Sequence, residues 1–319
     1  MTGPVTPAPG SPAPGSPAPG GRDFRCSRAS EEAGDGLAGS ASTVRAFLLV
    51  EAEGAWGAQA LRASLLTEPV QRWLGGLERR HGVRPLLVRR SGRARARGPV
   101  SVFAAWTAPG ASWTEHTALA AHDELPALEE DVAGIGRGAR PGWTPYDSSL
   151  FLVCTQGRHD ACCAERGRPV WEAMRHAAPE RSWQVSHIGG DRFAANVVVL
   201  PQGLYYGRMQ PHDAARLVAA DGRGVLLLDH LRGRSSLPFA VQAAEVFLRR
   251  ALALTVESDL SPRTQRVDGD LTTAVFVSRD VRWEVLVRTH HDEPRQLTCG
   301  ALAPSRPLRH ELVGLGPAT

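Results

Sequence analysis

Lysine is absent from this sequence of 319 residues, so all 37 basic side chains are arginines. Against 33 acidic residues they leave a net charge of only +4. The one dense basic cluster, RRSGRARARG at residues 89–98, lies on no nucleic-acid-binding motif and has no stacking aromatic side chains beside it. We expect a solvated arginine-rich loop there, or a docking point for an acidic partner. The sequence does not indicate nucleic-acid binding.

Long apolar runs are missing as well. None approaches the roughly 18 residues that a membrane-spanning helix needs. The first residues also lack the pattern of a signal peptide, which places a charged segment before an apolar one. Since hydrophobic residues still make up 42% of the chain, a packed core is expected. These features predict a soluble, cytoplasmic protein with no membrane association.

Cysteine is scarce, and its pattern is not that of a secreted protein. The five cysteines are an odd number, and no signal peptide accompanies them, which argues against a disulfide framework. A thiol oxidoreductase is disfavoured because the chain has no Cys-x-x-Cys motif and a bridge between adjacent cysteines is strained. A metal site together with uninvolved cysteines explains the count better.

The first 145 residues divide into a tail and a lobe. Residues 1–22 contain the repeat GSPAPGSPAPG, a composition that buries almost nothing and predicts a disordered tail. Residues 23–145 form an N-terminal α/β lobe, in which apolar runs predict strands at 45–51, 85–90 and 100–106. Helical spacing predicts a helix over 58–82, with a break or a second start at Pro69, and a partly helical segment over 117–138.

A second α/β unit is expected over residues 146–238, and a small α+β addition over 239–319. The last segment should contain a helix at 239–254, two strands at 272–279 and 281–289, and a tail. The pattern of the central unit predicts a strand at 149–155, a helix at 168–178, a strand at 182–190, a hairpin at 196–209 and a helix at 212–222.

Two segments of the central unit carry residues with metal-binding chemistry. FLVCTQGRHDACC at 151–163 brings Cys154 to the end of an apolar run, and Cys163 closes the loop after it. VSHIGGD at 185–191 places His187 and Asp191 around two glycines. Thiolate and imidazole are ligands for zinc and for iron–sulfur clusters, and the wide cysteine spacing favours a cluster over a zinc knuckle. Buried cysteines that only fill the core, and a histidine that only caps a turn, are the competing interpretation.

The run CTQGRHDACCAERGRPV followed by SHIGGDRFAANVVVLPQGLYYGRM resembles the sucrase/ferredoxin-like family, whose core is a thioredoxin-like [2Fe–2S] ferredoxin domain. The stretch CSRASEEAGDGLAGSASTVRAFLLVEAEGAWG is similar to the opening of actinobacterial members. The likeness covers roughly residues 23–305 and is strongest over 150–235. It implies an α/β fold with a thioredoxin-like ferredoxin domain at 146–238. The βαβ-containing lobe before this domain could be a degenerate thioredoxin-like unit.

The resemblance also implies a set of cluster ligands. The first two thiolates of the family fall on Cys154 and Cys163, with the adjacent Cys162 ranked behind them, and the third ligand falls on His187. Family members continue as Cys-x-x-x-Cys or His-x-x-x-His, but this chain has aspartate, Asp191, at the fourth position.

The identity of the fourth ligand stays open at this point. Asp191 is favoured, although a carboxylate is a harder and less usual donor to iron. Cys299 could instead reach the site from the tail. A site with an open position, or one without a cluster, is the remaining alternative.

The expected function is one-electron transfer through a [2Fe–2S] cluster to a redox partner protein that the sequence does not identify. This favours an electron-transfer protein over an enzyme that converts a substrate. The alternative is a thioredoxin-like interaction module, metal-free or stabilised by zinc, without a redox role. The word sucrase in the family name does not indicate glycosidase chemistry, which needs two carboxylates across a sugar-binding cleft, and no such pair can be assigned.

Overall fold

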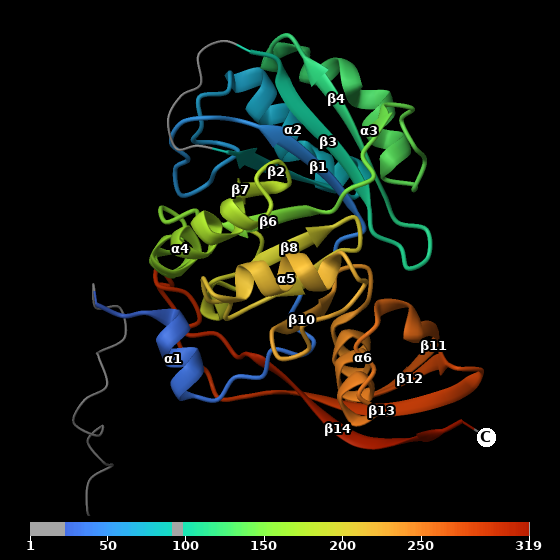
Figure 1. Ribbon diagram of the computed structural model, residues 1–319. Coiled ribbons are helices and arrows are strands. Elements are labelled where there is room, and N and C mark those ends of the chain that lie inside the picture. The colour runs from blue at the N-terminus through green and yellow to red at the C-terminus, as the bar shows by residue number, and fades with distance from the viewer. Residues whose placement is uncertain (1–22, 91–97, 319) are drawn as a thin grey trace, which may run out of the picture.

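The computed structural model of the chain describes residues 23–90 and 98–318. They form a ten-stranded mixed sheet of order β10-β9-β8-β6-β7-β2-β1-β3-β4-β5 and a four-stranded antiparallel sheet of order β11-β12-β13-β14 (Figure 1). The tail at 1–22 and most of the arginine-rich segment lie outside the described residues. Within the described ranges, no helix is both long enough and apolar enough to cross a lipid bilayer.

The amino-terminal half of the large sheet follows a short first helix, α1 (Cys26–Glu32). Strands β1 and β2 are parallel and connected through α2, while β3 pairs antiparallel with β1 and β4 antiparallel with β3. This arrangement confirms the predicted βαβ pattern. The elements of this half are β1 (Ala46–Glu51), α2 (Glu68–His81), β2 (Val83–Arg89), β3 (Val100–Trp106), β4 (Trp113–Leu119), η1 (His122–Leu128), α3 (Glu129–Ile135) and β5 (Thr144–Pro145).

Two details of this half differ from the prediction. Helix α2 occupies only the second part of the predicted range 58–82, because Pro69 lies in its first turn. There its missing N–H is harmless, but its ring would clash with a helical carbonyl four residues earlier. The segment predicted as partly helical over 117–138 begins inside strand β4, whose seven residues all pair with β3. Pairing between strands thus overrides the local helical pattern of this segment.

The second half of the large sheet repeats the order of the first. Strands β6 and β7 are parallel and connected through α4, β8 pairs antiparallel with β6, and β9 pairs antiparallel with β8. The predicted strand–helix–strand–hairpin order of this unit is confirmed. Its elements are β6 (Leu150–Cys154), α4 (Ala161–Ala177), β7 (Ser182–Val185), η2 (Asp191–Phe193), β8 (Val197–Leu200), β9 (Leu204–Tyr206), α5 (Asp213–Asp221) and β10 (Leu231–Arg234).

The two halves are joined in one continuous sheet. Strands β2 and β7 pair antiparallel, with Val88 opposite Val185. Alternate side chains of β1 take part in different cores: Leu48 packs toward α2, whereas Leu49 joins a core that also contains Leu152 and Cys154 of β6. The shared core therefore extends from the amino-terminal half to the cysteine at the end of β6.

The carboxy-terminal part packs α6 (Phe239–Ala251) against the small sheet. The short helix η3 (Glu257–Asp259) precedes the sheet. The strands of the sheet are β11 (Ser261–Asp268), β12 (Leu271–Ser278), β13 (Val281–His291) and β14 (Leu308–Pro317). The helix and the two central strands confirm the prediction. Strands β11 and β14 were not predicted, because both are largely exposed and lack a buried apolar run. Between β13 and β14 the chain returns to α1 and brings Cys299 there (Figure 1).

Candidate metal centre

Strand β6 delivers Cys154 to the interior of the protein. All five of its residues are buried, and Cys154 is its last residue. Helix α4 crosses this strand end very closely: a Cβ added to Gly167 would lie 2.0 Å from the carbonyl oxygen of Cys154. Only glycine allows this approach, which fixes the helix against the strand.

Helix α4 begins at Ala161 and not at residue 168 as the sequence indicated, so Cys162 and Cys163 lie in its first turn. The carboxylate of Asp160 accepts a hydrogen bond of 2.9 Å from the backbone N–H of Cys162 and thereby caps the helix. Asp160 is therefore the local sequence signal that the helix begins at Ala161. The side chains of Cys162 and Cys163 diverge from the helix end toward different neighbours.

The loop between β7 and β8 carries the other two predicted ligands, His187 and Asp191. It turns through Gly189 and Gly190, whose φ angles are +91° and +80°. These angles lie in the region that favours glycine. The buried guanidinium of Arg232 fills the space beside Gly190 and donates to the carbonyl oxygen of Gly189 at 3.0 Å. The two glycines therefore allow the loop to turn sharply and to pack closely against Arg232.

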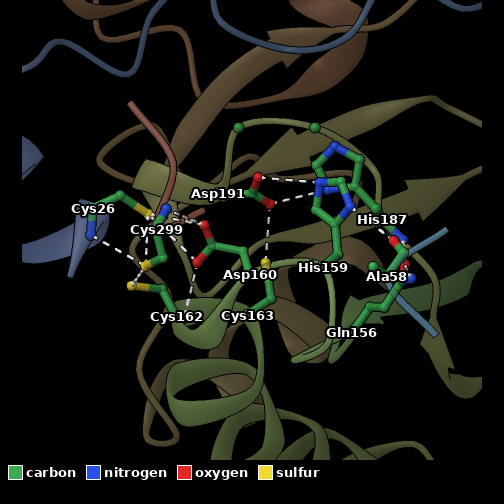
Figure 2. Close-up of polar contacts among 12 residues, drawn as sticks. Cys26, Ala58, Gln156, His159, Asp160, Cys162, Cys163, His187, Asp191 and Cys299 are labelled. Atoms are coloured by element: carbon green, nitrogen blue, oxygen red, sulfur yellow. Dashed lines mark hydrogen bonds and ion pairs between the residues drawn. The ribbon is translucent and has the colours of Figure 1, made fainter. Parts of the chain in front are cut away.

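The carboxylate of Asp191 lies at the centre of the site (Figure 2). Its Oδ1 is 3.1 Å from the Sγ of Cys163 and 3.0 Å from the Nδ1 of His187. Burial alone would raise the pKa of Asp191, but its contacts with His159 and His187 outweigh burial and lower the pKa. Asp191 is therefore ionised in a pocket from which water is largely excluded.

His159, which lies in the loop between Cys154 and Cys163, joins the site as well. Its ring stacks on that of His187 with 3.7 Å between ring centroids, and its Nε2 lies 3.6 Å from Oδ2 of Asp191. The contact with Asp191 raises the pKa of His159 to about 9. His159, His187 and Asp191 place one ligand atom each within 4.8 Å of one another, so they could hold a metal ion.

Cys154 and Cys163 are neighbours in the shared core. Their interaction, followed by burial and the nearby Asp191, raises the pKa of Cys163 well above the usual thiol value. Two buried thiols and a carboxylate cannot all be ionised together without a cation between them. Within the predicted set, Cys163 and His187 contact Asp191 directly, whereas Cys154 lies beside Cys163 in the same core.

Cys162 and Cys299 occupy a second group of donor atoms, on the other side of Asp160 (Figure 2). Together with Cys26 and Asp160 they could also hold a metal ion. The Sγ atoms of Cys162 and Cys299 are 3.4 Å apart. The sequence treated Cys26 as uninvolved, and no local pattern relates it to Cys162 and Cys299, which lie 136 and 273 positions further along the chain.

A comparison with known families identifies the chain. The sequence model described as Sucrase/ferredoxin-like matches residues 37–233, which is more than half of the chain. The protein belongs to the sucrase/ferredoxin-like family. The matched range of this sucrase/ferredoxin-like protein contains all four predicted ligands, whereas Cys26 and Cys299 lie outside it. The similarity to actinobacterial members stays a prediction.

A curated relative is "Altered inheritance of mitochondria protein 32" of Meyerozyma guilliermondii. The two proteins are 28% identical over 95 residues, which is 26% of this chain and 34% of the relative. The chain therefore matches about a third of the relative's length. No solved structure matches the chain.

Proposed function

We propose that this protein is a one-electron carrier that holds a [2Fe–2S] cluster through Cys154, Cys163, His187 and Asp191. One observation carries the proposal. The thiol of Cys163 and the imidazole of His187 both contact the buried carboxylate of Asp191, and Cys154 lies beside Cys163 in the same core. They do so in a family whose description contains the word ferredoxin.

The donor atoms fit such a cluster in number and in chemical type. Two sulfurs, one imidazole nitrogen and one carboxylate oxygen make four ligands, and mixed sulfur and nitrogen ligation is known for [2Fe–2S] centres. The Nδ1 of His187 is buried and pairs with Oδ1 of Asp191 at 3.0 Å. His187 and Asp191 thus offer one nitrogen donor and one oxygen donor side by side.

The topology over 150–206 supports a thioredoxin-like unit. Strands β6 and β7 form a parallel βαβ pair and the antiparallel hairpin of β8 and β9 follows, which is the order expected of a thioredoxin-like domain. Residues 46–119 repeat this order but contain no cysteine. We therefore assign the amino-terminal half as a degenerate unit without a cluster. Its role is to support the site of the second unit.

Backbone carbonyls of the amino-terminal half hold the site residues in place. The side-chain oxygen of Gln156 accepts a hydrogen bond of 2.7 Å from the backbone N–H of His187, while its Nε2 donates to Gly57 at 2.7 Å. The Nδ1 of His159 lies 3.1 Å from the carbonyl oxygen of Ala58. These contacts orient both imidazole rings before any metal binds.

The burial of the ligands suggests a direction for electron transfer. Cys154, Cys163 and Asp191 are buried, whereas His159 is exposed and His187 is half-buried beside a pocket of about 570 Å³. When bound, the cluster accepts and releases one electron. The histidine side is the face at which a partner protein would approach, and the imidazolium of His159 offsets the charge of Asp191.

Anaerobic purification of the full chain tests this proposal. We expect about two iron atoms and about two acid-labile sulfides per chain, together with a red-brown colour. Cys163→Ser should lose both, whereas Cys162→Ser, the same substitution at the next residue, should keep them. Circular dichroism of both variants checks that they fold.

The proposal fails if the wild-type protein contains no acid-labile sulfide. It also fails if Cys162→Ser removes iron and sulfide while Cys163→Ser does not. Folded protein without iron or sulfide would favour the interaction module without a redox role.

A further inference from the structure

The second group of donor atoms brings together three segments that are far apart in the sequence. Cys26 is the first residue of α1, Cys162 lies in the first turn of α4, and Cys299 lies in the segment that connects β13 to β14. Asp160, which caps α4, is the fourth member. One ligand atom of each lies within 4.8 Å of all the others (Figure 2).

The separations match those around a single tetrahedral ion. The Sγ of Cys299 is 3.4 Å from that of Cys162 and 3.7 Å from that of Cys26. Zinc–sulfur bonds of about 2.3 Å place two thiolates of a tetrahedral site about 3.8 Å apart. Both carboxylate oxygens of Asp160 are 3.5 Å from the Sγ of Cys26. Mixed oxygen and sulfur ligands of zinc lie about 3.5 Å apart.

The group is closed to solvent and holds a buried carboxylate among its thiols. Cys26 and Cys162 are 1% exposed, Asp160 is 2% exposed, and only Cys299 is partly accessible. The carboxylate of Asp160 accepts hydrogen bonds from the backbone N–H groups of Cys162 and Cys299, at 2.9 Å and 2.7 Å. Among the described residues, no arginine or histidine forms an ion pair with it. A buried carboxylate beside three thiols is costly unless a cation accompanies it.

Further contacts stabilise negatively charged sulfur in this group. The hydroxyl of Ser27 donates to the Sγ of Cys162 at 3.2 Å, and the backbone N–H of Cys26 donates to the Sγ of Cys299 at 3.5 Å. The amino-terminal end of α4 also favours a thiolate in its first turn. Such support is typical of the surroundings of metal ligands.

We propose that Cys26, Cys162, Cys299 and one carboxylate oxygen of Asp160 bind a single zinc ion. Three sulfur–hydrogen bonds are replaced by three sulfur–zinc bonds, and the three protons pass to solvent. A closed site with four protein ligands is structural and not catalytic. The ion fastens α1 and the carboxy-terminal segment to the helix that carries Cys163. This assignment does not depend on the iron–sulfur cluster.

Metal analysis of the anaerobically purified full chain tests the proposal. We expect about one zinc per chain, and a zinc X-ray absorption spectrum that shows three sulfur ligands and one oxygen ligand. Cys162→Ser and Cys299→Ser should each lower the zinc content to below about a tenth. Cys163→Ser is the matched control and should keep the zinc. Cys299→Ser keeps the test decisive if Cys162→Ser does not fold, since Cys299 is the least buried of the three cysteines.

Three outcomes would overturn the zinc site. One is wild-type protein without zinc, and another is a disulfide among these three cysteines, seen as a loss of two hydrogens in the intact mass. The third is zinc that disappears in Cys163→Ser and persists in Cys162→Ser, which would place the ion at the other site. Iron and sulfide measured in the same samples separate this result from a failure of the electron-carrier proposal.

Discussion

The Sγ atoms of Cys162 and Cys163 belong to adjacent residues but lie in different groups of donor atoms. The Sγ of Cys162 is 3.4 Å from the Sγ of Cys299, whereas the Sγ of Cys163 is 3.1 Å from Oδ1 of Asp191. Successive residues of a helix point about 100° apart, so one turn can serve two sites. Asp160 holds this turn by capping it.

Asp191→His should raise the reduction potential of the bound cluster by on the order of 100 mV, because a neutral imidazole replaces a carboxylate and leaves the cluster less negative. A redox titration followed by visible absorbance measures this shift. Asp191→Asn is the comparison, since an amide is a poor ligand for iron, and it should reduce the iron content instead. An unchanged potential in Asp191→His would contradict the role of Asp191 as a ligand.

Gly167→Ala should displace α4 from the end of β6, since the added Cβ would lie 2.0 Å from the carbonyl oxygen of Cys154. We expect a loss of about 1–3 kcal/mol in the free energy of unfolding, together with a lower iron content. The control is Gly75→Ala in α2, where an added Cβ meets nothing within 4 Å. That change should be neutral or stabilising by about 0.5–1 kcal/mol. Urea denaturation of both variants measures the difference, and equal effects would contradict the close approach.

Glu245→Gln should destabilise the contact between α6 and the rest of the chain. The carboxylate of Glu245 is buried, with Oε1 3.0 Å from Nε of Arg249 and 3.6 Å from Nη2 of Arg234. Removing this negative charge leaves the buried guanidinium groups of Arg234 and Arg249 without part of their counter-charge. We expect a loss of about 3 kcal/mol in the free energy of unfolding. Glu172→Gln, which breaks an exposed pair with Arg175, should cost less than about 0.5 kcal/mol. Similar denaturation midpoints for the two variants would refute this expectation.

Glu129 should make the stability of the amino-terminal half depend on pH below 4.5. Hydrogen bonds from His81, Arg80 and Trp73 lower its pKa from 4.5 to about 2. Because the pKa is lowered in the folded state, the stabilisation is complete above pH 4.5 and is lost as the pH falls toward 2. Its size is about 1 kcal/mol or less, since the side chain is 41% exposed.

Denaturation of the wild type and of Glu129→Gln at a series of pH values checks this dependence. The wild type should be the more stable protein at pH 6, and the difference should shrink as the solution becomes acidic. A difference that stays constant from pH 6 to pH 2 would exclude the ionised Glu129 as its source.

The sequence predicted the order of the elements around the site because local signals define them. The buried strand that ends at Cys154 is a short apolar run, and the hairpin of β8 and β9 is two such runs around a turn. Strand β4 was not predicted because its sequence, WTEHTAL, mixes polar and apolar residues without an apolar run, and its pairing with β3 is what makes it a strand. The early start of α4 depends on one side chain, Asp160, which caps the helix. In the sequence this signal is easily missed, because the cysteines that follow Asp160 suggest a ligand loop and not a helix.

The two groups of donor atoms were predictable to different degrees. His187 and Asp191 share a short motif, so their proximity follows from local sequence. The group around Cys162 could not be predicted, because Cys26 and Cys299 approach it only after α1 and the carboxy-terminal segment have packed. His159 likewise gained its contact with Asp191 through the meeting of two loops.

The antiparallel pairing of β2 with β7 has a practical consequence for isolating the half of the sheet that carries Cys154 and Cys163. A fragment cut near residue 145 would expose the edge of its sheet at β7 and would leave Gln156 and His159 without the carbonyl oxygens of Gly57 and Ala58. An open strand edge invites association between copies. A minimal fragment for spectroscopy should therefore retain residues 46–145, even though they contain none of the cysteines.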